Sequence, residues 1–304
     1  MVFPGQGSQS VGMLSGLADA YPQVADTFNE ASDVLGYDLW ALVKDGPAED
    51  LNRTDRTQPA MLAAGVAVWR IWQARKGRMP AVMAGHSLGE YSALVCAGAL
   101  NYTDAIGLVA ERGRCMQDAV AAGSGAMAAI LGLSDEAVAA VCTEAAQGDV
   151  VTAVNFNSPG QVVIAGDAQA VQRAIALAKE TGAKRAILLP VSVPSHCALM
   201  KPAAERFARQ LQETAIAAPQ LPVIQNVDVT AHETPGDIRD ALERQLYRPV
   251  QWVRTIEAMR QRGVERIIEA GPGKVLAGLC KRIDKSLTAL PAHDPDSLDA
   301  ALDY

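Results

Sequence analysis

The sequence lacks an excess of positive charge and contains few aromatic side chains. It has 27 lysines and arginines against 34 aspartates and glutamates, a formal net charge of −7, and aromatic residues make up 5% of its 304 residues. Proteins that bind nucleic acid through its phosphates need a basic surface, so this balance argues against a nucleic-acid partner. Hydrophobic residues nevertheless reach 49%, which excludes a disordered chain and predicts a sizeable buried core.

Cysteine is also scarce. The five cysteines lie far apart and form neither a CxxC pair nor a Cys/His cluster with the spacing of zinc ligands: Cys96, Cys115, Cys142, Cys197 and Cys280. We therefore expect no bound metal and reduced, mostly buried thiols. The sequence shows no signal peptide and no apolar run long enough to span a bilayer, so we expect a cytoplasmic protein with no membrane partner.

A serine between two glycines is the most informative feature that the sequence does contain. The apolar run at 81–84 leads into GHSLG at 85–89, and a helical pattern follows from Glu90. This order predicts a strand, a sharp turn and a helix, with Ser87 exposed at the turn. The first backbone N–H groups of such a helix can stabilise an oxyanion beside a nucleophilic serine. Ser87 and Glu90 also fit a capping box, in which serine only closes the helix N-terminus, so the motif alone leaves both interpretations open.

A nucleophilic serine needs a base, and the chain has four histidines. We expect His293, in a polar tail, and His232, in a polar loop, to be solvated. His86 adjoins Ser87, but on a tight turn its ring is expected to point away from the hydroxyl and to pack. His196, in a proline-containing loop, is therefore the best candidate for the general base.

The order of elements predicts an α/β fold. Helical and strand patterns alternate, and glycine loops at 5–9, 85–89 and 271–273 follow predicted strands, which is typical of a parallel sheet covered on both faces. The carboxyl ends of parallel strands would bring these loops to one rim. The first loop lacks the glycine pattern of a dinucleotide or phosphate site. It is either a backbone N–H donor site or an ordinary turn.

A different pattern interrupts this alternation. Strands are predicted at 126–133, 150–155, 161–165 and 184–191, with helices that begin after Ser134 and Asp167. The order β-α-β-β-α-β is that of a ferredoxin-like unit. We therefore expect a subdomain over 124–192, inserted in a body made of 1–123 and 193–304. In that body we expect helices at 15–35, 58–76, 102–121, 200–215, 235–246 and 249–262, strands at 219–229 and 265–270, and a last helix through Arg282.

Six motifs stand in the order seen in bacterial malonyl-CoA:acyl carrier protein transacylases, a family that the chain resembles over almost its whole length. They are PGQGSQ at 4–9, GHSLGE at 85–90, ERG at 111–113, NFNSPGQ at 155–161, VPSH at 193–196 and GPGK at 271–274. The resemblance implies an α/β-hydrolase-like body with a ferredoxin-like subdomain. One departure is that the family's first strand usually begins several residues earlier than it does here, which leaves the support of the first glycine loop uncertain from sequence.

The resemblance also implies a set of roles. Ser87 would be the acylated nucleophile and His196 its base, with a carbonyl oxygen at Gln245 orienting the imidazole in place of an aspartate. The backbone N–H groups of Gln6 and Leu88 would form the oxyanion hole.

Arg112 is the residue that would select the substrate. An arginine on an amphipathic helix is ordinarily a surface cation, but the resemblance makes it the bidentate partner of the free malonyl carboxylate. An acetyl group would leave the guanidinium unpaired, at a cost of about 1–3 kcal/mol.

The implied reaction is a ping-pong transfer of malonyl from malonyl-CoA to the phosphopantetheine thiol of holo acyl carrier protein for fatty-acid synthesis, with no bound cofactor. The carrier protein is acidic, so a local basic patch would have to bind it. Lys274, Lys281, Arg282 and Lys285 are candidates, although a solvated helix end explains them equally well.

Two other functions compete with the transfer. A serine esterase or thioesterase would share the turn and the histidine but needs an acidic triad member and no arginine. A non-catalytic binder of carrier protein would not need Ser87, His196 and Arg112.

Overall fold

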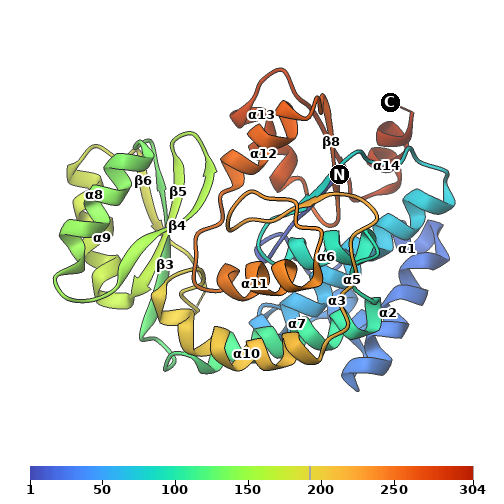
Figure 1. Ribbon diagram of the computed structural model, residues 1–304, viewed down its shortest axis with the longest axis horizontal. Helices are drawn as coiled ribbons and strands as arrows, with labels where there is room; N and C mark the ends of the chain where they lie inside the picture. Colours follow the sequence, from blue (N-terminus) through green and yellow to red (C-terminus); the bar gives the residue numbers. More distant parts are fainter. Residues whose placement is uncertain (192, 304) are drawn as a thin grey trace.

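Five parallel strands form the larger of two sheets in the structure, a computed structural model that describes residues 1–191 and 193–303 (Figure 1). The strand order is β7-β2-β1-β8-β9, and each neighbouring pair runs parallel, which confirms the predicted α/β class. The strands are β1 (Val2–Phe3), β2 (Met83–Gly85), β7 (Val223–Ile224), β8 (Arg266–Ala270) and β9 (Thr288–Ala292).

Both faces of this sheet are covered by helices. Because successive side chains of a strand point to opposite faces, Phe3 of β1 lies in one core and Val2 in another. Such two-sided burial is what a parallel sheet requires. The helices that contribute to the Phe3 core are α1 (Ser15–Ala20), α2 (Pro22–Leu35), α3 (Leu39–Asp45), α4 (Ala48–Leu51), α5 (Thr54–Ala74), α6 (Gly89–Cys96), α7 (Tyr102–Asp118), α10 (Lys201–Glu213), α11 (Pro235–Gln245) and α14 (Pro295–Leu302). Those of the Val2 core are α12 (Trp252–Gln261) and α13 (Val275–Ile283). We call this part of the molecule the body.

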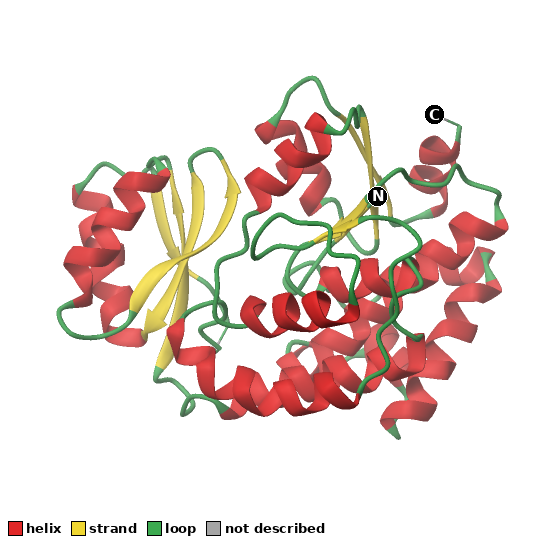
Figure 2. Ribbon diagram, viewed as in Figure 1, coloured by secondary structure: helices red, strands yellow, loops and turns green. Residues whose placement is uncertain are grey.

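The second sheet is antiparallel and has the strand order β4-β5-β3-β6. It lies at the left of Figure 2, with two helices packed on its outer face. Its elements are β3 (Gly125–Leu131), α8 (Asp135–Ala146), β4 (Val151–Ser158), β5 (Gln161–Asp167), α9 (Ala168–Glu180) and β6 (Arg185–Leu188). The predicted order β-α-β-β-α-β is therefore confirmed, and we call this part the subdomain. The short helix η1 (Ala198–Met200) follows it.

Several sequence expectations were wrong in detail. The predicted strand at 219–229 shrinks to the two residues of β7, and the supposed polar tail forms β9 and α14. A capping box at Asp294 and Ser297 starts α14, a signal that outweighs the polar composition. Asp167 precedes α9 as expected, but its carboxylate accepts the N–H of Val150 and does not cap the helix.

Close backbone contacts hold the glycine loops together at the carboxyl ends of β1 and β2. A Cβ atom at Gly85 would lie 1.8 Å from the carbonyl carbon of Gly89, and one at Gly5 would lie 2.4 Å from the carbonyl oxygen of His86. A side chain is therefore excluded at both positions. Gly271, which follows β8, in turn lies against Pro4. The predicted rim of three loops is thus present.

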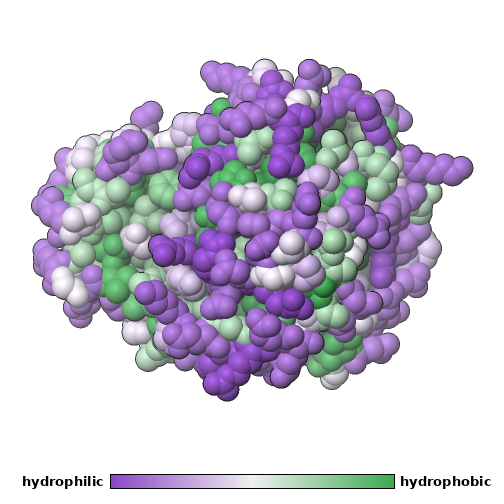
Figure 3. Space-filling model, in the orientation of Figure 1, coloured by the Kyte–Doolittle hydropathy of each residue, from purple (hydrophilic) through white to green (hydrophobic). Residues whose placement is uncertain are grey.

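The face of the molecule drawn in Figure 3 has no single dominant apolar area. In the view of Figure 3, hydrophilic side chains cover most of the molecule and apolar ones form scattered patches, including one over the subdomain at left. Ile187 and Leu188 of β6 are the exposed large apolar residues of that region. Within residues 1–191 and 193–303, none of the helices combines the length and the hydropathy needed to cross a membrane.

Candidate active site

Ser87 occupies the sharp turn between β2 and α6. Its φ of 51° lies in the left-handed region, which a side-chain-bearing residue adopts only when its surroundings hold it there. The N-cap of α6 is Leu88, and no side-chain hydrogen bond caps this helix. The capping-box interpretation of Ser87 and Glu90 is therefore wrong. Instead, the Glu90 carboxylate accepts the N–H of Asn226 at 2.7 Å.

His196, which is 109 positions from Ser87 in the sequence, contacts the serine hydroxyl. Its Nε2 lies 2.8 Å from Ser87 Oγ, and its Nδ1 lies 2.7 Å from the carbonyl oxygen of Gln245. Because a carbonyl oxygen can only accept, Nδ1 carries the proton and Nε2 is free to accept from the hydroxyl. Burial, with the nearby Arg112 cation, lowers the pKa of His196 to about 3. The imidazole is thus a neutral proton acceptor at physiological pH.

Arg112 of α7 is buried and only 1% exposed, not the surface cation that an amphipathic helix would give. Its guanidinium donates to Gln58 Oε1 at 2.8 Å and to Gln245 Oε1 at 3.0 Å, and it lies 3.5 Å from Ser87 Oγ. Among the described residues no carboxylate forms an ion pair with it. Burial lowers the pKa of Arg112, but an arginine remains charged in proteins. A buried cation with neutral partners is a ready site for an anion.

The loop after β1 lies beside the turn that carries Ser87. A Cβ atom at Gly5 would be 3.7 Å from the backbone nitrogen of Leu88. In the described part of the chain, the N–H groups of Gln6 and Leu88 have no acceptor, so both can donate to an added oxygen atom. Although β1 has two residues only, His86 N donates to Phe3 O at 3.0 Å and fixes the start of the loop.

These groups line a small cavity of about 110 Å³. The body contributes Gln6, Ser87, Arg112 and His196 to its lining. The subdomain and the segment after it contribute an apolar wall, formed by Met127, Val163, Leu189 and Val191. Because ordinary ligand sites for drug-sized molecules are about 300–1,000 Å³, this cavity favours a short acyl group.

A larger cavity of about 360 Å³ lies at the other end of the parallel strands. Met1, which precedes β1, and Arg266, which starts β8, are among the residues that line it. Functional groups of parallel sheets gather at the carboxyl ends of the strands, and the cavity beside Ser87 is at that end. We therefore assign the chemistry to the smaller cavity.

Two buried polar residues of the site escaped the sequence prediction. Gln58 lies on the buried side of α5 and orients Arg112. It ends the polar stretch that begins at Thr54, so its sequence context indicates an exposed residue and gives no signal of its role. Asn226 accepts the N–H of Ser87 and donates to Gly85 O, both at 2.7 Å. Nothing local marks Asn226, because it approaches Ser87 from 139 positions away in the sequence.

The other three histidines lie outside the reacting pair. As predicted, the His86 ring points away from the hydroxyl. It packs on Trp252, and its Nε2 is 2.8 Å from Asn157 Oδ1. The expectation that His232 and His293 are merely solvated was wrong. Their rings are 3.1 Å from a carboxylate oxygen of Asp228 and Asp294, respectively.

The cysteines carry no metal or disulfide chemistry in the described part of the chain. All five are buried free thiols, as predicted, and burial raises the pKa of Cys197 to about 11. Within residues 1–191 and 193–303, no three His, Cys, Asp or Glu side chains are grouped as metal ligands.

Known proteins match the chain over nearly its whole length. The acyl transferase domain family matches residues 1–296. The chain is 60% identical to the malonyl CoA-acyl carrier protein transacylase of Salmonella typhimurium, over 99% of this chain and 97% of that protein. It is 61% identical to the protein of the same name from Escherichia coli, over 99% and 98%.

Solved structures are similar to this chain over nearly its whole length as well. An acyl carrier protein S-malonyltransferase from Vibrio cholerae superposes with a TM-score of 0.96 at 64% identity, with 98% of each chain covered. A malonyl-transacylase solved in complex with a type II PKS acyl-carrier protein has a TM-score of 0.99 at 58% identity, with 100% of this chain and 98% of that chain covered.

Proposed function

Because this chain belongs to the acyl transferase family of malonyl-CoA:acyl carrier protein transacylases, we propose that it carries the malonyl group on Ser87 between its two substrates. The protein is an acyltransferase that moves malonyl from malonyl-CoA to acyl carrier protein and so supplies fatty-acid synthesis. The observation that carries the proposed mechanism is the meeting of Ser87, His196 and Arg112 at one cavity.

In the first half-reaction, Ser87 Oγ attacks the thioester carbonyl carbon of malonyl-CoA and gives its proton to His196 Nε2. The Gln245 carbonyl holds Nδ1–H and keeps the ring in line, with an N···O distance of 2.7 Å. The carbonyl oxygen becomes an oxyanion and accepts the N–H groups of Gln6 and Leu88. When the C–S bond breaks, the CoA thiolate takes the proton from His196, and malonyl-Ser87 remains.

The second half-reaction reverses these steps with another thiol. The phosphopantetheine thiol of acyl carrier protein gives its proton to His196 Nε2 and attacks the malonyl-Ser87 ester. The same two N–H groups stabilise the second tetrahedral intermediate. The ester C–O bond breaks, Ser87 recovers the proton from His196, and malonyl leaves as a thioester.

Arg112 selects a substrate with a free carboxylate. We propose that the malonyl carboxylate accepts two N–H groups of the guanidinium, while Gln58 and Gln245 keep its plane fixed. Their distances of 2.8 and 3.0 Å and the burial of Arg112 support this role. A malonyl group neutralises the buried charge, and an acetyl group leaves it without a counterion.

Acyl transfer between two thiols needs a nucleophile, a base and oxyanion donors, all of which the chain's own residues provide. We therefore propose that malonyl-CoA acts as substrate and that no resident cofactor is used. We also propose a cytoplasmic location, in keeping with the five free thiols.

We further infer that residues 1–123 and 193–304 form the catalytic body and 124–192 the inserted subdomain. Separate apolar cores in the two parts support this division. The boundary position 192 and the last position 304 lie outside the described residues.

The geometry disfavours the two competing functions. A serine esterase would orient its histidine with a carboxylate, whereas His196 Nδ1 meets a backbone carbonyl. A binder without catalysis has no use for a neutral imidazole 2.8 Å from a serine hydroxyl.

One labelling experiment tests the proposal. The protein is mixed with equal amounts of malonyl-, methylmalonyl- and acetyl-CoA, and the intact mass and the modified peptide are measured before and after holo acyl carrier protein is added. We expect one malonyl group on Ser87 that carrier protein removes. Rapid loss of the group to water would identify a hydrolase, and the absence of any adduct would identify a binder.

A further inference from the structure

Two segments that are far from Ser87 in sequence form hydrogen bonds with its backbone. The first is the loop at 225–231, which contributes Asn226. The Asn226 side chain bonds the N–H of Ser87 and the carbonyl of Gly85, and its backbone N–H donates to the Glu90 carboxylate, each at 2.7 Å. This loop therefore fixes the strained backbone on both flanks of the serine.

The second segment is the end of α11, which contributes Gln245. Its side-chain Nε2 donates to the carbonyl oxygen of Ser87 at 3.1 Å, and its Oε1 accepts from Arg112. Its backbone carbonyl holds His196. The position of Gln245 thus determines where the base and the guanidinium lie relative to the serine.

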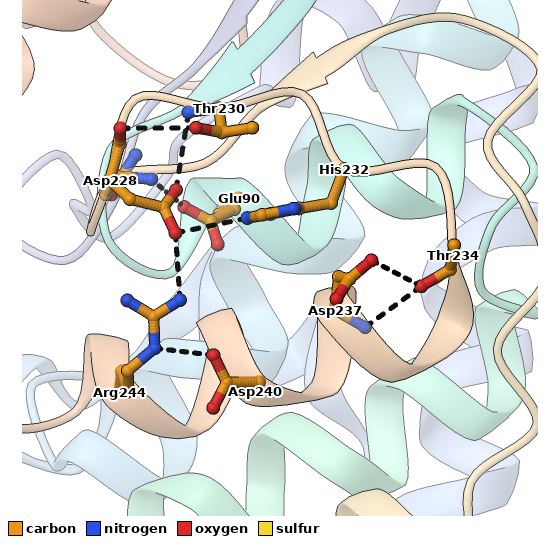
Figure 4. A network of polar contacts seen from close by, with 9 residues as sticks. Glu90, Asp228, Thr230, His232, Thr234, Asp237, Asp240 and Arg244 are labelled. Atoms are coloured by element: carbon orange, nitrogen blue, oxygen red, sulfur yellow. Dashed lines mark hydrogen bonds and ion pairs between the residues drawn. The ribbon is translucent and has the colours of Figure 1, made fainter.

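An ion pair joins these two segments. Arg244, next to Gln245 on α11, donates to Asp228 Oδ2 of the loop at 2.8 Å, and its Nε donates to Asp240 at 2.6 Å (Figure 4). His232 Nε2 lies 3.1 Å from the same Asp228 oxygen. Asp228 and Arg244 are half-buried, with 27% and 29% of their side chains exposed.

The loop is short and stiff enough to transmit a displacement of Asp228 to Asn226. Gln225 N donates to Thr230 O, and Val229 N donates back to Gln225 O, both at 3.0 Å. Val229 has a φ of 61°, in the left-handed region. Asp228 is two residues from Asn226. We therefore expect a shift of the Asp228 carboxylate to move the Asn226 side-chain amide, which accepts the N–H of Ser87.

We propose that the Asp228–Arg244 ion pair is a positioning device that fixes where Ser87 lies relative to His196 and Arg112. Neither residue touches the reacting atoms. The pair fixes the spacing between the loop that holds the nucleophile and the helix end that holds the base. This role rests on the proposed acylation of Ser87.

The device acts on the rate of chemistry more than on folding. An ion pair whose side chains are partly exposed to solvent contributes little to global stability. A small misplacement of reacting groups, in contrast, slows the chemical step strongly.

The test measures single-turnover malonylation of Ser87 by intact-mass spectrometry in Asp228→Asn, Arg244→Gln and the double variant. We expect each variant to acylate about ten-fold more slowly at saturating malonyl-CoA, with the half-saturating concentration changed less than about two-fold. The double variant is expected to be no slower than either single one, because both changes break the same connection. Arg244→Lys, which keeps the cation, is expected to recover most of the rate.

The matched control is the Arg260–Asp284 pair, in which both side chains are 31% exposed and the N···O distance is 2.9 Å. It joins α12 to the turn before β9, away from Ser87. Arg260→Gln and Asp284→Asn are expected to acylate at the wild-type rate and to lower the melting temperature as much as the test variants do. Test variants that acylate like these controls, or whose effects simply multiply in the double variant, would refute the positioning role. Wild-type protein that takes no malonyl group would contradict the proposed function itself.

Discussion

The two sheets contribute different kinds of group to the cavity beside Ser87. Among the described residues, the body supplies the charged and reactive groups there, including Ser87, Arg112 and His196. The subdomain supplies Asn155 and the wall residues Met127 and Val163, and the segment after it supplies Leu189 and Val191. In the proposed mechanism, one region thus carries the chemistry and the other excludes water from it.

The difference follows from how each sheet is built. The parallel strands have two to five residues and end in loops that crowd together, which exposes backbone N–H groups and one serine. The antiparallel strands have four to eight residues, and the face opposite α8 and α9 presents apolar side chains such as Met127 and Val163. A dry wall strengthens each electrostatic contact inside the cavity and disfavours hydrolysis of an acyl-enzyme.

The largest expected effect tests the reactive side directly. Ser87→Ala is expected to abolish the malonyl adduct and to lower transfer by about 10⁴-fold, because no nucleophile remains. Intact-mass spectrometry and a carrier-protein malonylation assay measure the two losses. Ser195→Ala, which removes another hydroxyl that lines the cavity, is the control and is expected to keep its adduct. A labelled Ser87→Ala protein would place the nucleophile elsewhere.

Removal of the buried cation tests substrate selection. Arg112→Ala is expected to lower kcat/KM for malonyl-CoA by about 10²-fold, because the free carboxylate loses a charged, bidentate partner. Acetyl transfer is expected to persist. Arg114→Ala, on the same helix but 61% exposed and paired with Glu111, is expected to change neither rate. Equal loss of malonyl and acetyl transfer would show that Arg112 is structural.

The candidate carrier-protein patch consists of cations on α13 and on the residues that flank it, where the body approaches the subdomain. Lys274, Lys281 and Lys285 are exposed, and Arg282 donates to Gln161 of β5 at 2.8 Å. The double reversal Lys281→Glu/Arg282→Glu is expected to raise KM for carrier protein about ten-fold at low salt, and less at high salt, since exposed charges are screened.

Acylation by malonyl-CoA alone is expected to be unchanged in that variant. The control Lys76→Glu/Arg78→Glu reverses two exposed cations at the opposite end of the strands and is expected to leave KM unaltered. An unchanged carrier-protein KM in the test variant would remove the patch from the docking surface.

The apolar wall can be tested with two neighbouring valines of β5. Val163 faces the cavity, whereas Val162 faces the helices of the subdomain. Val163→Ala is expected to raise the hydrolysis rate of malonyl-Ser87 about five-fold by admitting water, with acylation nearly unchanged. Val162→Ala makes the same change on the other face and is expected to cost stability only. Equal hydrolysis in the two variants would contradict a shielding role.

The smallest expected effect is the change of kcat/KM with pH, which reports on His196, the proposed base. With the pKa of His196 lowered to about 3, kcat/KM is expected to fall less than about two-fold from pH 7 to pH 5. An imidazole with an ordinary pKa of about 6.5 would lower kcat/KM about 25-fold over the same interval. Because the Arg112 cation also lowers this pKa, Arg112→Gln is expected to move the acid limb to higher pH.

The same shift has a consequence for stability. The pKa of His196 in the folded state lies below its value in the unfolded state. The contribution of this group to the free energy of unfolding is therefore complete above a pH of about 6.5. That contribution is lost as the pH falls toward 3. For the activity prediction, a fall of kcat/KM with an apparent pKa near 6.5 would contradict the lowered pKa and show that His196 is hydrated in the free enzyme.

Much of the fold could be predicted because its signals are local. The glycines around Ser87 and the β-α-β-β-α-β order of the subdomain each depend on short stretches of sequence. The errors arose where local composition misled. Polar residues conceal the start of α14, which Asp294 and Ser297 cap, and β7 spans two residues only.

The sequence by itself determined the strained turn at Ser87, because glycine and a small residue at the right positions are a local requirement. Only the tertiary structure decided which polar groups surround that serine. Gln58 and Asn226 reach the site across 54 and 139 positions of sequence, through contacts with Arg112 and Ser87. Such contacts depend on how helices and loops pack, and no spacing along the chain encodes them.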